Sequence, residues 1–500
     1  MSGSDLHRDA LGVVMASFAG PAVPPWLADA VRGGLGSVCL FASNLGPDDG
    51  RARALTEELH AACGPGLPGV LVALDEEGGD VTRLDSARGS DLPAPAALGV
   101  ADDVPLTRAV AAALGRRLRA VGVDLDLAPV ADVDADPRNP VIGVRSVGAD
   151  AALVARHVAA AVEELQGAGV AACVKHFPGH GDVATDSHLG LPELAVDAAT
   201  LQARELVPFR AAIAAGVEAV MSGHLRVPAL DPVAPASTSA AATALLRESL
   251  GFTGVLVTDA LDMAGVSGPA AHGSLPAAAV AALAAGADLL CLGADKTADD
   301  LAGVVTAIEV AVADGRLPTQ RLAEAAGRVR ALATRAAARR AAAPPAVTGD
   351  GGLAASAEVA RRALRVTGTL PPTLAGALVV RFSANPSIAV GPVPWGLADV
   401  AGAAGVAWPG AEFVDAAPGD DLDVLLARAA GRPLVAVVRD AARTPALLGA
   451  LDHLHARRPD VVVVELGRPA GPLPGGAVVT TSGASRSSAW AAVELLTAAR

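Results

Sequence analysis

Short apolar runs recur along the first 300 residues, and most are separated by Ala-rich stretches with scattered Arg and Glu, such as residues 151–167 and 198–215. Each run is short and is bounded by polar or turn residues, which is typical of a buried strand, whereas the separating stretches have the length of helices. Eight strands that alternate with helices predict a (β/α)₈ barrel, although a doubly wound α/β sheet would give a similar pattern. The predicted strands cover residues 11–18, 37–41, 70–75, 123–128, 170–176, 219–224, 254–259 and 287–293.

The polar residues that follow these runs favour the barrel. The carboxyl ends of four predicted strands carry side chains that can do chemistry, namely Asp75, Lys175 with His176, His224, and Asp259. In a (β/α)₈ barrel these ends meet at one rim, where the active site is built. The sequence therefore predicts that residues almost 200 positions apart share one site.

A second domain is expected after the barrel. Residues 319–343 form a long predicted helix with Thr319 as its N-cap, and the helix ends before Pro344 and Pro345. Beyond it, residues 377–382, 434–438, 461–466 and 477–480 are predicted strands, with helices near 443–457 and 487–499, which fits a three-layer α/β domain with a parallel sheet. We therefore divide the chain into a catalytic barrel (1–338), a linker (339–352) and a smaller α/β sandwich domain (353–500) that packs on the barrel and shapes one side of the cleft.

Composition narrows the range of partners. The net charge of −14 disfavours binding to nucleic acid or to an anionic membrane, and no membrane-spanning helix is expected. The apolar run near the N-terminus is predicted to be the first strand and not a leader peptide. The four Cys form no C-x-x-C pair, so we expect buried thiols and a cytoplasmic location. Only Trp26 among the four Trp precedes residue 395, and Tyr is absent, so few rings are available to stack on a long polysaccharide and the substrate is expected to be short.

The densest chemistry follows the fifth predicted strand, in the sequence KHFPGHGDVATDSH. In an extended segment Asp186 and His188 point the same way, so Asp186 can accept the ring N–H of His188 and orient it as a general acid/base. Two other interpretations remain open at this point. The loop could be a solvated polar segment, or it could hold a metal ion through His176, His180, Asp186 and His188.

Three further segments supply candidates. In LDEEGGDVTR, Asp75 and Arg83 can grip sugar hydroxyls, although a charged turn would contain the same pair. The irregular stretch 134–146 can deliver Arg145 to the site, with Arg138 as the competing candidate. Asp132 and Asp134, around the start of that stretch, are either helix caps or ligands.

Asp259 directly follows the strand GVLVT. A carboxylate at this position can act as a nucleophile, bind a metal or cap the next helix, and Asp262 is a poorer candidate. With His188 as proton donor, Asp259 completes a two-step displacement at an anomeric carbon.

Taken together, KHFPGHG-x4-DSH, the D-x-E-G-G-x-V-x-R segment, NPVIGVRS and VTDALDM resemble family 3 glycoside hydrolases, in particular the bacterial β-N-acetylglucosaminidase branch. MSGH, VPALDP and DGRLPTQRL are also similar to that branch, so the resemblance covers the whole predicted barrel. After residue 353 it is weaker and rests on VVVVELGRP and TSGASRSSAWAAVELL.

The resemblance implies a (β/α)₈ barrel, no metal or other cofactor, and retention of configuration through a covalent intermediate. It makes Asp259 the nucleophile and His188 the acid/base with Asp186 as its partner. The substrate-binding residues it implies are Asp75, Arg83, Arg145, Lys175 and His176, and we add His224 from its strand end. Asp80 departs from the pattern, since relatives usually carry Arg there.

The predicted activity is release of terminal GlcNAc from a small carbohydrate, either a muropeptide in peptidoglycan recycling or a chitin oligomer. A phosphorylase that uses phosphate in place of water is the main alternative, because an imidazole tolerates an incoming anion better than a carboxylate does. A metal-dependent barrel hydrolase and a non-catalytic sugar-binding protein are the others. The sequence does not predict an oligomeric state.

Overall fold

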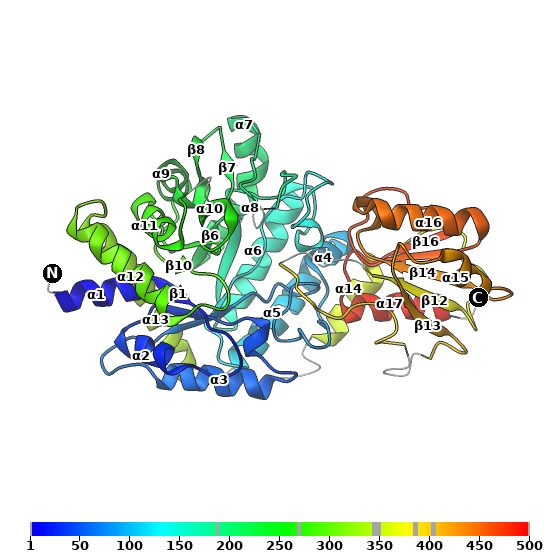
Figure 1. Cartoon of the computed structure of the whole chain (residues 1–500), viewed down its shortest axis with the longest axis horizontal. Coiled ribbons are helices and arrows are strands. Elements are labelled where there is room, and N and C mark those ends of the chain that lie inside the picture. Colours follow the sequence, from blue (N-terminus) through cyan, green and yellow to red (C-terminus); the bar gives the residue numbers. More distant parts are fainter. Residues whose placement is uncertain are drawn as a thin grey trace.

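The computed structural model describes residues 3–186, 190–267, 272–342, 352–383, 389–401 and 407–498. The chain forms a barrel domain and a C-terminal α/β domain that lie side by side (Figure 1). Helix α14 (Leu353–Ala363) lies where the two domains meet and packs on α4 (Pro95–Ala101) and α5 (Val104–Ala120) of the barrel and on α17 (Arg486–Thr497) of the second domain.

The barrel contains a parallel sheet of eight strands in the order β10-β1-β2-β3-β4-β5-β6-β9. Backbone pairing between Val257 and Leu289 joins the two end strands and closes the barrel. The strands are β1 (Val14–Ala16), β2 (Ser37–Cys39), β3 (Leu71–Leu74), β4 (Leu125–Asp126), β5 (Ala171–Phe177), β6 (Ala219–Ser222), β9 (Val255–Thr258) and β10 (Leu290–Cys291). Each falls within or next to one of the eight predicted runs, so the barrel prediction is confirmed.

Alternate strand residues face the two sides of the barrel wall. Met15, Cys39 and Cys173 belong to the cluster inside the barrel, whereas Val14, Val38 and Val174 belong to the layer between strands and helices. This alternation follows from the pleat of a strand, which directs successive side chains to opposite faces. The predicted burial of the strand thiols is confirmed for Cys39, Cys173 and Cys291.

Helices surround the barrel. The larger ones are α1 (Gly3–Gly12), α2 (Pro25–Gly33), α3 (Asp49–Ala61), α4, α5, α6 (Ala151–Gly167), α8 (Leu206–Ala214), α11 (Leu275–Ala285), α12 (Ala298–Ala313) and α13 (Thr319–Ala341), and a short hairpin of β7 (Arg226–Val227) and β8 (Asp231–Pro235) follows β6. No helix in the described part of the chain is both long and apolar enough to cross a membrane.

Helix α13 closes the end of the barrel opposite the predicted site. Its Val329 and Leu332 join the interior cluster of the barrel. Arg339 lies 2.6 Å from Glu218 and Arg328 lies 3.1 Å from Asp288, and both acids precede barrel strands at their amino ends. The plugged end leaves the carboxyl ends of the strands as the open face of the barrel.

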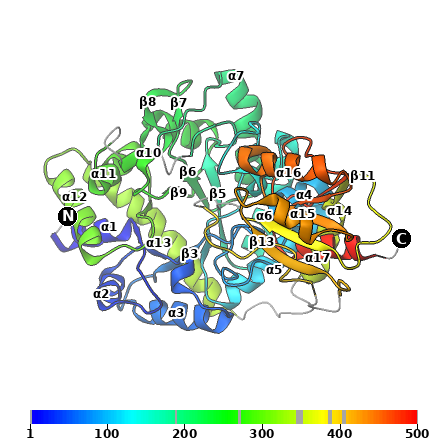
Figure 2. The ribbon, with the colours of Figure 1, turned by 45° about the vertical axis from the view of Figure 1, so that its right-hand side comes forward.

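The C-terminal domain has a six-stranded sheet in the order β11-β16-β15-β14-β12-β13, with helices α15 (Leu422–Arg428) and α16 (Pro445–Arg457) on one face and α17 on the other. Its strands are β11 (Arg365–Gly368), β12 (Leu378–Phe382), β13 (Glu412–Ala416), β14 (Leu434–Val438), β15 (Val462–Glu465) and β16 (Ala477–Thr480). Figure 2 shows this domain against the side of the barrel that carries α4 and α5. The predicted three-layer α/β architecture is confirmed.

Several details differ from the sequence predictions. The sheet of the second domain is not wholly parallel, because β11 pairs antiparallel with β16, and strands β11 and β13 were not predicted. Helix α13 begins at Thr319, but the preceding Pro318 is its N-cap and no side chain caps it. Helix α1 extends to Gly12, so β1 is shorter than the predicted run. The helical residues 339–341 belong to α13, and most of the remaining predicted linker, residues 343–351, lies outside the described residues.

Candidate active site

A cavity of about 660 Å³ opens at the carboxyl ends of the barrel strands. Six of the nine predicted site residues line it: Asp75, Arg83, Arg145, Lys175, His176 and Asp259. They come from the loops after β3, β4 and β9 and from the end of β5, so the fold brings together residues that lie far apart in sequence. Asp259 shares the cavity with Asp75 and Lys175, which the proposed chemistry requires.

Lys175 lies at the centre of a network of ion pairs in this cavity. Its Nζ atom is 2.6 Å from Oδ1 of Asp75 and 2.8 Å from Oε1 of Glu77. Arg145 completes the network, because its Nε and Nη2 atoms donate to the two carboxylate oxygens of Glu77 at 2.8 and 2.7 Å. The side chains of Lys175, Glu77 and Arg145 are no more than 7% exposed, so little water screens these charges.

The network keeps its members ionised. Burial alone would raise the pKa of Asp75 and of Glu77, but the nearby cations outweigh it and lower both pKa values. Burial would likewise lower the pKa of Lys175, but Asp75 and Glu77 together raise it. An ionised Asp75 held by a buried ammonium is an oriented acceptor for sugar hydroxyls.

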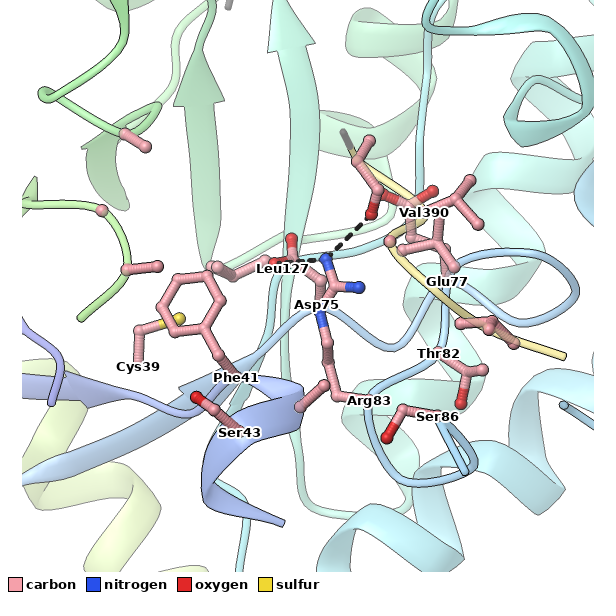
Figure 3. A pocket seen from close by; sticks show the side chains of 18 of the residues that line it. Cys39, Phe41, Ser43, Asp75, Glu77, Thr82, Arg83, Ser86, Leu127 and Val390 are labelled. Carbon is pink, nitrogen blue, oxygen red and sulfur yellow. Dashed lines mark hydrogen bonds and ion pairs between the residues drawn. The ribbon is translucent and has the colours of Figure 1, made fainter. Parts of the chain in front are cut away.

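Arg83 connects the barrel side of the cavity to the second domain. Its Nη2 atom is 3.5 Å from Oδ2 of Asp75 and donates to the backbone oxygen of Ala389 at 3.1 Å. Figure 3 shows the guanidinium of Arg83 between Asp75 and the segment that carries Val390. Residues 389–393 line the cavity, so the sequence prediction that the C-terminal domain shapes one side of the cleft has a structural basis.

Asp132 fixes the end of β5. Its Oδ2 atom is 2.8 Å from Nδ1 of His176, and its Oδ1 atom accepts the backbone N–H groups of His176 and His180 at 3.1 and 2.7 Å. Burial would raise the pKa of Asp132, but the two histidines lower it, so the carboxylate accepts the Nδ1 proton of His176. Asp132 is thus neither a helix cap nor a direct cavity residue, and it orients His176.

His180 also lines the cavity. Burial and the neighbouring His176 lower the pKa of His180 to about 4, although Asp132 acts in the opposite direction. The ring is therefore neutral near pH 7. Among the described residues, no group of three or more His, Cys, Asp or Glu side chains is arranged to hold a metal ion.

Asp259 follows β9, and its backbone N–H donates to the oxygen of Ser222 at 3.0 Å. One carboxylate oxygen, Oδ1, accepts the N–H of Ala260 at 2.8 Å. Asp262 lies on the exposed rim of the same cavity, where Lys296 approaches it at 2.7 Å. Of the two aspartates, Asp259 is the one held next to the strand end.

His224 does not line the cavity and is fully buried. Its Nδ1 atom is 2.7 Å from the hydroxyl of Ser237, and its Nε2 atom is 2.9 Å from the backbone oxygen of Ala260. The carbonyl oxygen can only accept, so Nε2 donates and Nδ1 accepts. This placement does not support the sugar-binding role predicted for His224, and we assign it to holding the backbone next to Asp259.

The acid/base pair is only partly described. Asp186 is buried, does not line the cavity, and accepts the N–H of Gly190 through its backbone oxygen at 3.2 Å. His188 lies outside the described residues. The predicted pairing of Asp186 with His188 therefore stays a prediction.

Sequence reasoning missed Glu77, His180 as a cavity residue, and residues 389–393. Glu77 could have been found, because two buried cations need more negative charge than Asp75 supplies and an acidic pair directly follows Asp75. Residues 389–393 carry no comparable pattern, since their sequence, AVGPV, contains only apolar side chains and Gly.

A buried carboxyl behind the cavity yields a test of stability against pH. Glu76 accepts the N–H groups of Arg83 and Leu84, and burial raises its pKa to about 7. Ionisation of a carboxyl whose folded pKa is raised costs stability, so this cost grows as the pH rises from about 4.5 to 7. We expect Glu76→Gln to raise the free energy of unfolding above pH 7 by roughly 3 kcal/mol at most, and to give no gain at pH 4.5. Urea unfolding at the two pH values measures the difference from the wild type. Glu57→Gln on the exposed face of α3 is the control, and an equal gain at both pH values would contradict the assignment.

Comparison with known proteins identifies the family of the chain. The model of the family described as "Glycosyl hydrolase family 3 N terminal domain" matches residues 26–332, which is more than half of the chain. The chain belongs to glycoside hydrolase family 3. The resemblance inferred from the motifs is confirmed, and the chain is a glycoside hydrolase.

The relatives within family 3 agree with this assignment. A beta-hexosaminidase from Methylococcus capsulatus is 37% identical over 297 residues, which is 59% of this chain and 85% of that protein. Beta-hexosaminidase A from Pseudoalteromonas piscicida is 36% identical over 266 residues, 49% of this chain, but only 44% of that protein is covered. The solved family 3 beta-N-acetylglucosaminidase from Paenibacillus sp. str. FPU-7 has 30% identity and a TM-score of 0.88, and the match covers 98% of this chain and 96% of that one. The match to the Paenibacillus structure includes both domains.

Proposed function

We propose that the protein is an exo-acting, retaining β-N-acetylglucosaminidase that releases terminal GlcNAc from short substrates. The observation that carries the proposal is the placement of Asp259 in the same cavity as the network of Asp75, Lys175, Glu77 and Arg145. A nucleophile and an oriented hydroxyl acceptor must face one bound sugar for such a reaction. The beta-hexosaminidase names of the relatives support the choice of hexosamine.

The reaction proceeds in two displacements. A carboxylate oxygen of Asp259 attacks the anomeric carbon and forms a covalent bond, while the bond to the leaving oxygen breaks and His188 donates a proton to that oxygen. In the second step His188 removes a proton from water, whose oxygen attacks the same carbon and releases Asp259. Two inversions give net retention. Asp186 holds the imidazole of His188 in the tautomer that both steps need.

The cavity fits a short substrate. Its volume is typical of a site for one or two sugar units. Among the described residues that line it, Phe41 is the only Phe, Tyr or Trp. The site therefore lacks a row of stacking rings for a long chain. These features support release of a terminal sugar from a short substrate. We extend the proposal to muropeptides or chitin oligomers as substrates and to the cytoplasm as the location, as the sequence predicts.

The charge of the cavity favours water over phosphate as the acceptor. Its described lining carries five carboxylates (Asp75, Glu77, Asp259, Asp262 and Asp295) and three cations (Arg83, Arg145 and Lys175). Each of these cations already contacts a carboxylate. A phosphate dianion entering this lining would meet an excess of like charge. We therefore place hydrolysis ahead of phosphorolysis.

We expect the enzyme to release free GlcNAc from an aryl β-N-acetylglucosaminide at a rate that phosphate does not change. Proton NMR during turnover should show the β-anomer of GlcNAc first, because two inversions retain the configuration. Sulfate at the same ionic strength is the control. Formation of GlcNAc 1-phosphate in phosphate buffer would establish the phosphorylase, and α-anomer appearing first would exclude the covalent intermediate.

A further inference from the structure

The structure places Asp80 between the two domains. It lies on the tight turn after β3 that also carries Asp75, Glu77 and Arg83. The backbone N–H of Glu77 donates to the oxygen of Val81 at 3.1 Å and closes the turn. Asp75, Glu77 and Arg83 line the cavity, whereas Asp80 is buried and does not.

The carboxylate of Asp80 is bound entirely by the second domain in the contacts described. Its Oδ2 atom is 2.6 Å from Nη2 of Arg439, and its Oδ1 atom accepts the backbone N–H of Ala484 at 2.8 Å. Arg439 directly follows β14, and its side chain is 8% exposed against 1% for Asp80. Removing one partner of a buried ion pair strongly destabilises the structure, because the other charge is left without compensation.

Close packing surrounds this ion pair. Gly483 has a φ of 147°, and a Cβ atom there would lie 2.5 Å from the Cβ of Ala94 on the barrel. Only glycine allows the two backbones to approach so closely. The C-terminal domain therefore fixes the position of the turn on the side that does not line the cavity.

The C-terminal domain also contacts the side of the turn that lines the cavity, through Arg83. The backbone oxygen of Ala389 accepts from Arg83, and residues 389–393 form an apolar wall of the cavity. Val390 in this wall is 4% exposed. The C-terminal domain thus holds the turn at Asp80 on one side. On the other side it covers Arg83 beside Asp75, as Figure 3 shows.

We infer that Asp80 and Arg439 are positioning residues, and that their ion pair places the 389–393 wall and Arg83 against the terminal sugar. The inference rests on the proposed function and deepens it, because it makes the C-terminal domain part of the subsite for the terminal sugar. The wall contacts Arg83 beside Asp75, so its loss is expected to weaken binding of the terminal sugar whatever the leaving group.

The test compares Asp80→Asn, Arg439→Met and the double variant in the full chain. We expect each single variant to raise KM about tenfold on an aryl β-N-acetylglucosaminide and on the GlcNAc disaccharide, with kcat within about threefold. The double variant should be no worse than the poorer single variant, because removing both charges leaves neither unpaired. Arg486→Met is the matched control. Its ion pair with Asp91 also joins the domains at 3.0 Å, but it is half-buried and lies outside the cavity lining, so KM should change less than about twofold.

The inference would be overturned by an unchanged KM in both single variants, or by an equal rise in KM in Arg486→Met. A loss of kcat with unchanged KM would also overturn it. If the ion-pair variants do not fold, Val390→Ala tests the wall without touching the ion pair, and an unchanged KM in that variant would refute the role of the wall. If the wild type releases no GlcNAc, the proposed function fails, which is a result distinct from turnover with unchanged KM.

Discussion

Replacing Asp259 by Asn is expected to lower kcat on an activated aryl β-N-acetylglucosaminide by about 10⁴-fold, because an amide cannot form the glycosyl ester. The fold should persist, since Asn keeps the shape of Asp259 and its oxygen can still accept the N–H of Ala260. Steady-state kinetics measures the effect, with circular dichroism to establish that the variant is folded. The matched control is Asp262→Asn, three residues along on the exposed rim, which should keep kcat within about threefold.

A second variant identifies the face of attack. In Asp259→Ala, azide can occupy the space of the lost carboxylate and attack the anomeric carbon from the same side, which gives the α-glycosyl azide. Formation of this product would show that the side chain of Asp259 faces the anomeric carbon. The nucleophile assignment would be wrong if Asp259→Asn retained a tenth of the activity while Asp262→Asn lost it.

Replacing Lys175 by Met is expected to cost about 3–5 kcal/mol in the free energy of unfolding of the barrel, because it removes the charge shared by Asp75 and Glu77 in a buried site. KM should rise at least about a hundredfold, since Asp75 loses the partner that orients it. Urea unfolding and steady-state kinetics measure the two effects. Lys296→Met is the control, because its ion pair with Asp262 lies at the rim and should contribute less than about 1 kcal/mol.

The stability cost of Lys175→Met should depend on pH in a defined direction. The folded pKa values of Asp75 and Glu77 are lowered, so the stability that their ionised forms contribute is present above pH 4 or so and is lost as the pH falls. The difference in stability between Lys175→Met and the wild type should therefore shrink in acid. A difference that stays constant down to pH 3 would mean that loss of packing, and not loss of charge, causes the effect.

The sequence contained most of the barrel because the relevant rules are local. A short apolar run predicts a buried strand, and the residue that follows it at the open rim is free to be polar. These two patterns predict the eight strands of the barrel and the placement of Asp75, Lys175, His176 and Asp259 in one cavity. Family motifs then supplied the chemistry, including the acid/base pair of Asp186 and His188, which remains a prediction.

The patterns did not distinguish side chains that face the cavity from those that face the protein. His224 and Asp259 both follow strands, yet the ring of His224 is fully buried and binds Ser237 and the backbone of Ala260. The pleat of the strand and the packing of the neighbouring loop decide which way such a side chain faces. A polar residue at a strand end therefore does not by itself predict whether it faces the cavity.

By itself, the sequence determined the two domains, the strands of the barrel and the residue types at its open rim, because strand length and alternation depend only on neighbouring residues. The tertiary structure decided which charges neutralise each other and which domain walls the site. Lys175 pairs with Glu77 nearly 100 positions away, Asp80 pairs with Arg439, and Arg83 binds Ala389. Such partners are selected by distance in space and by the exclusion of water, and both arise only when the barrel closes and the two domains pack together.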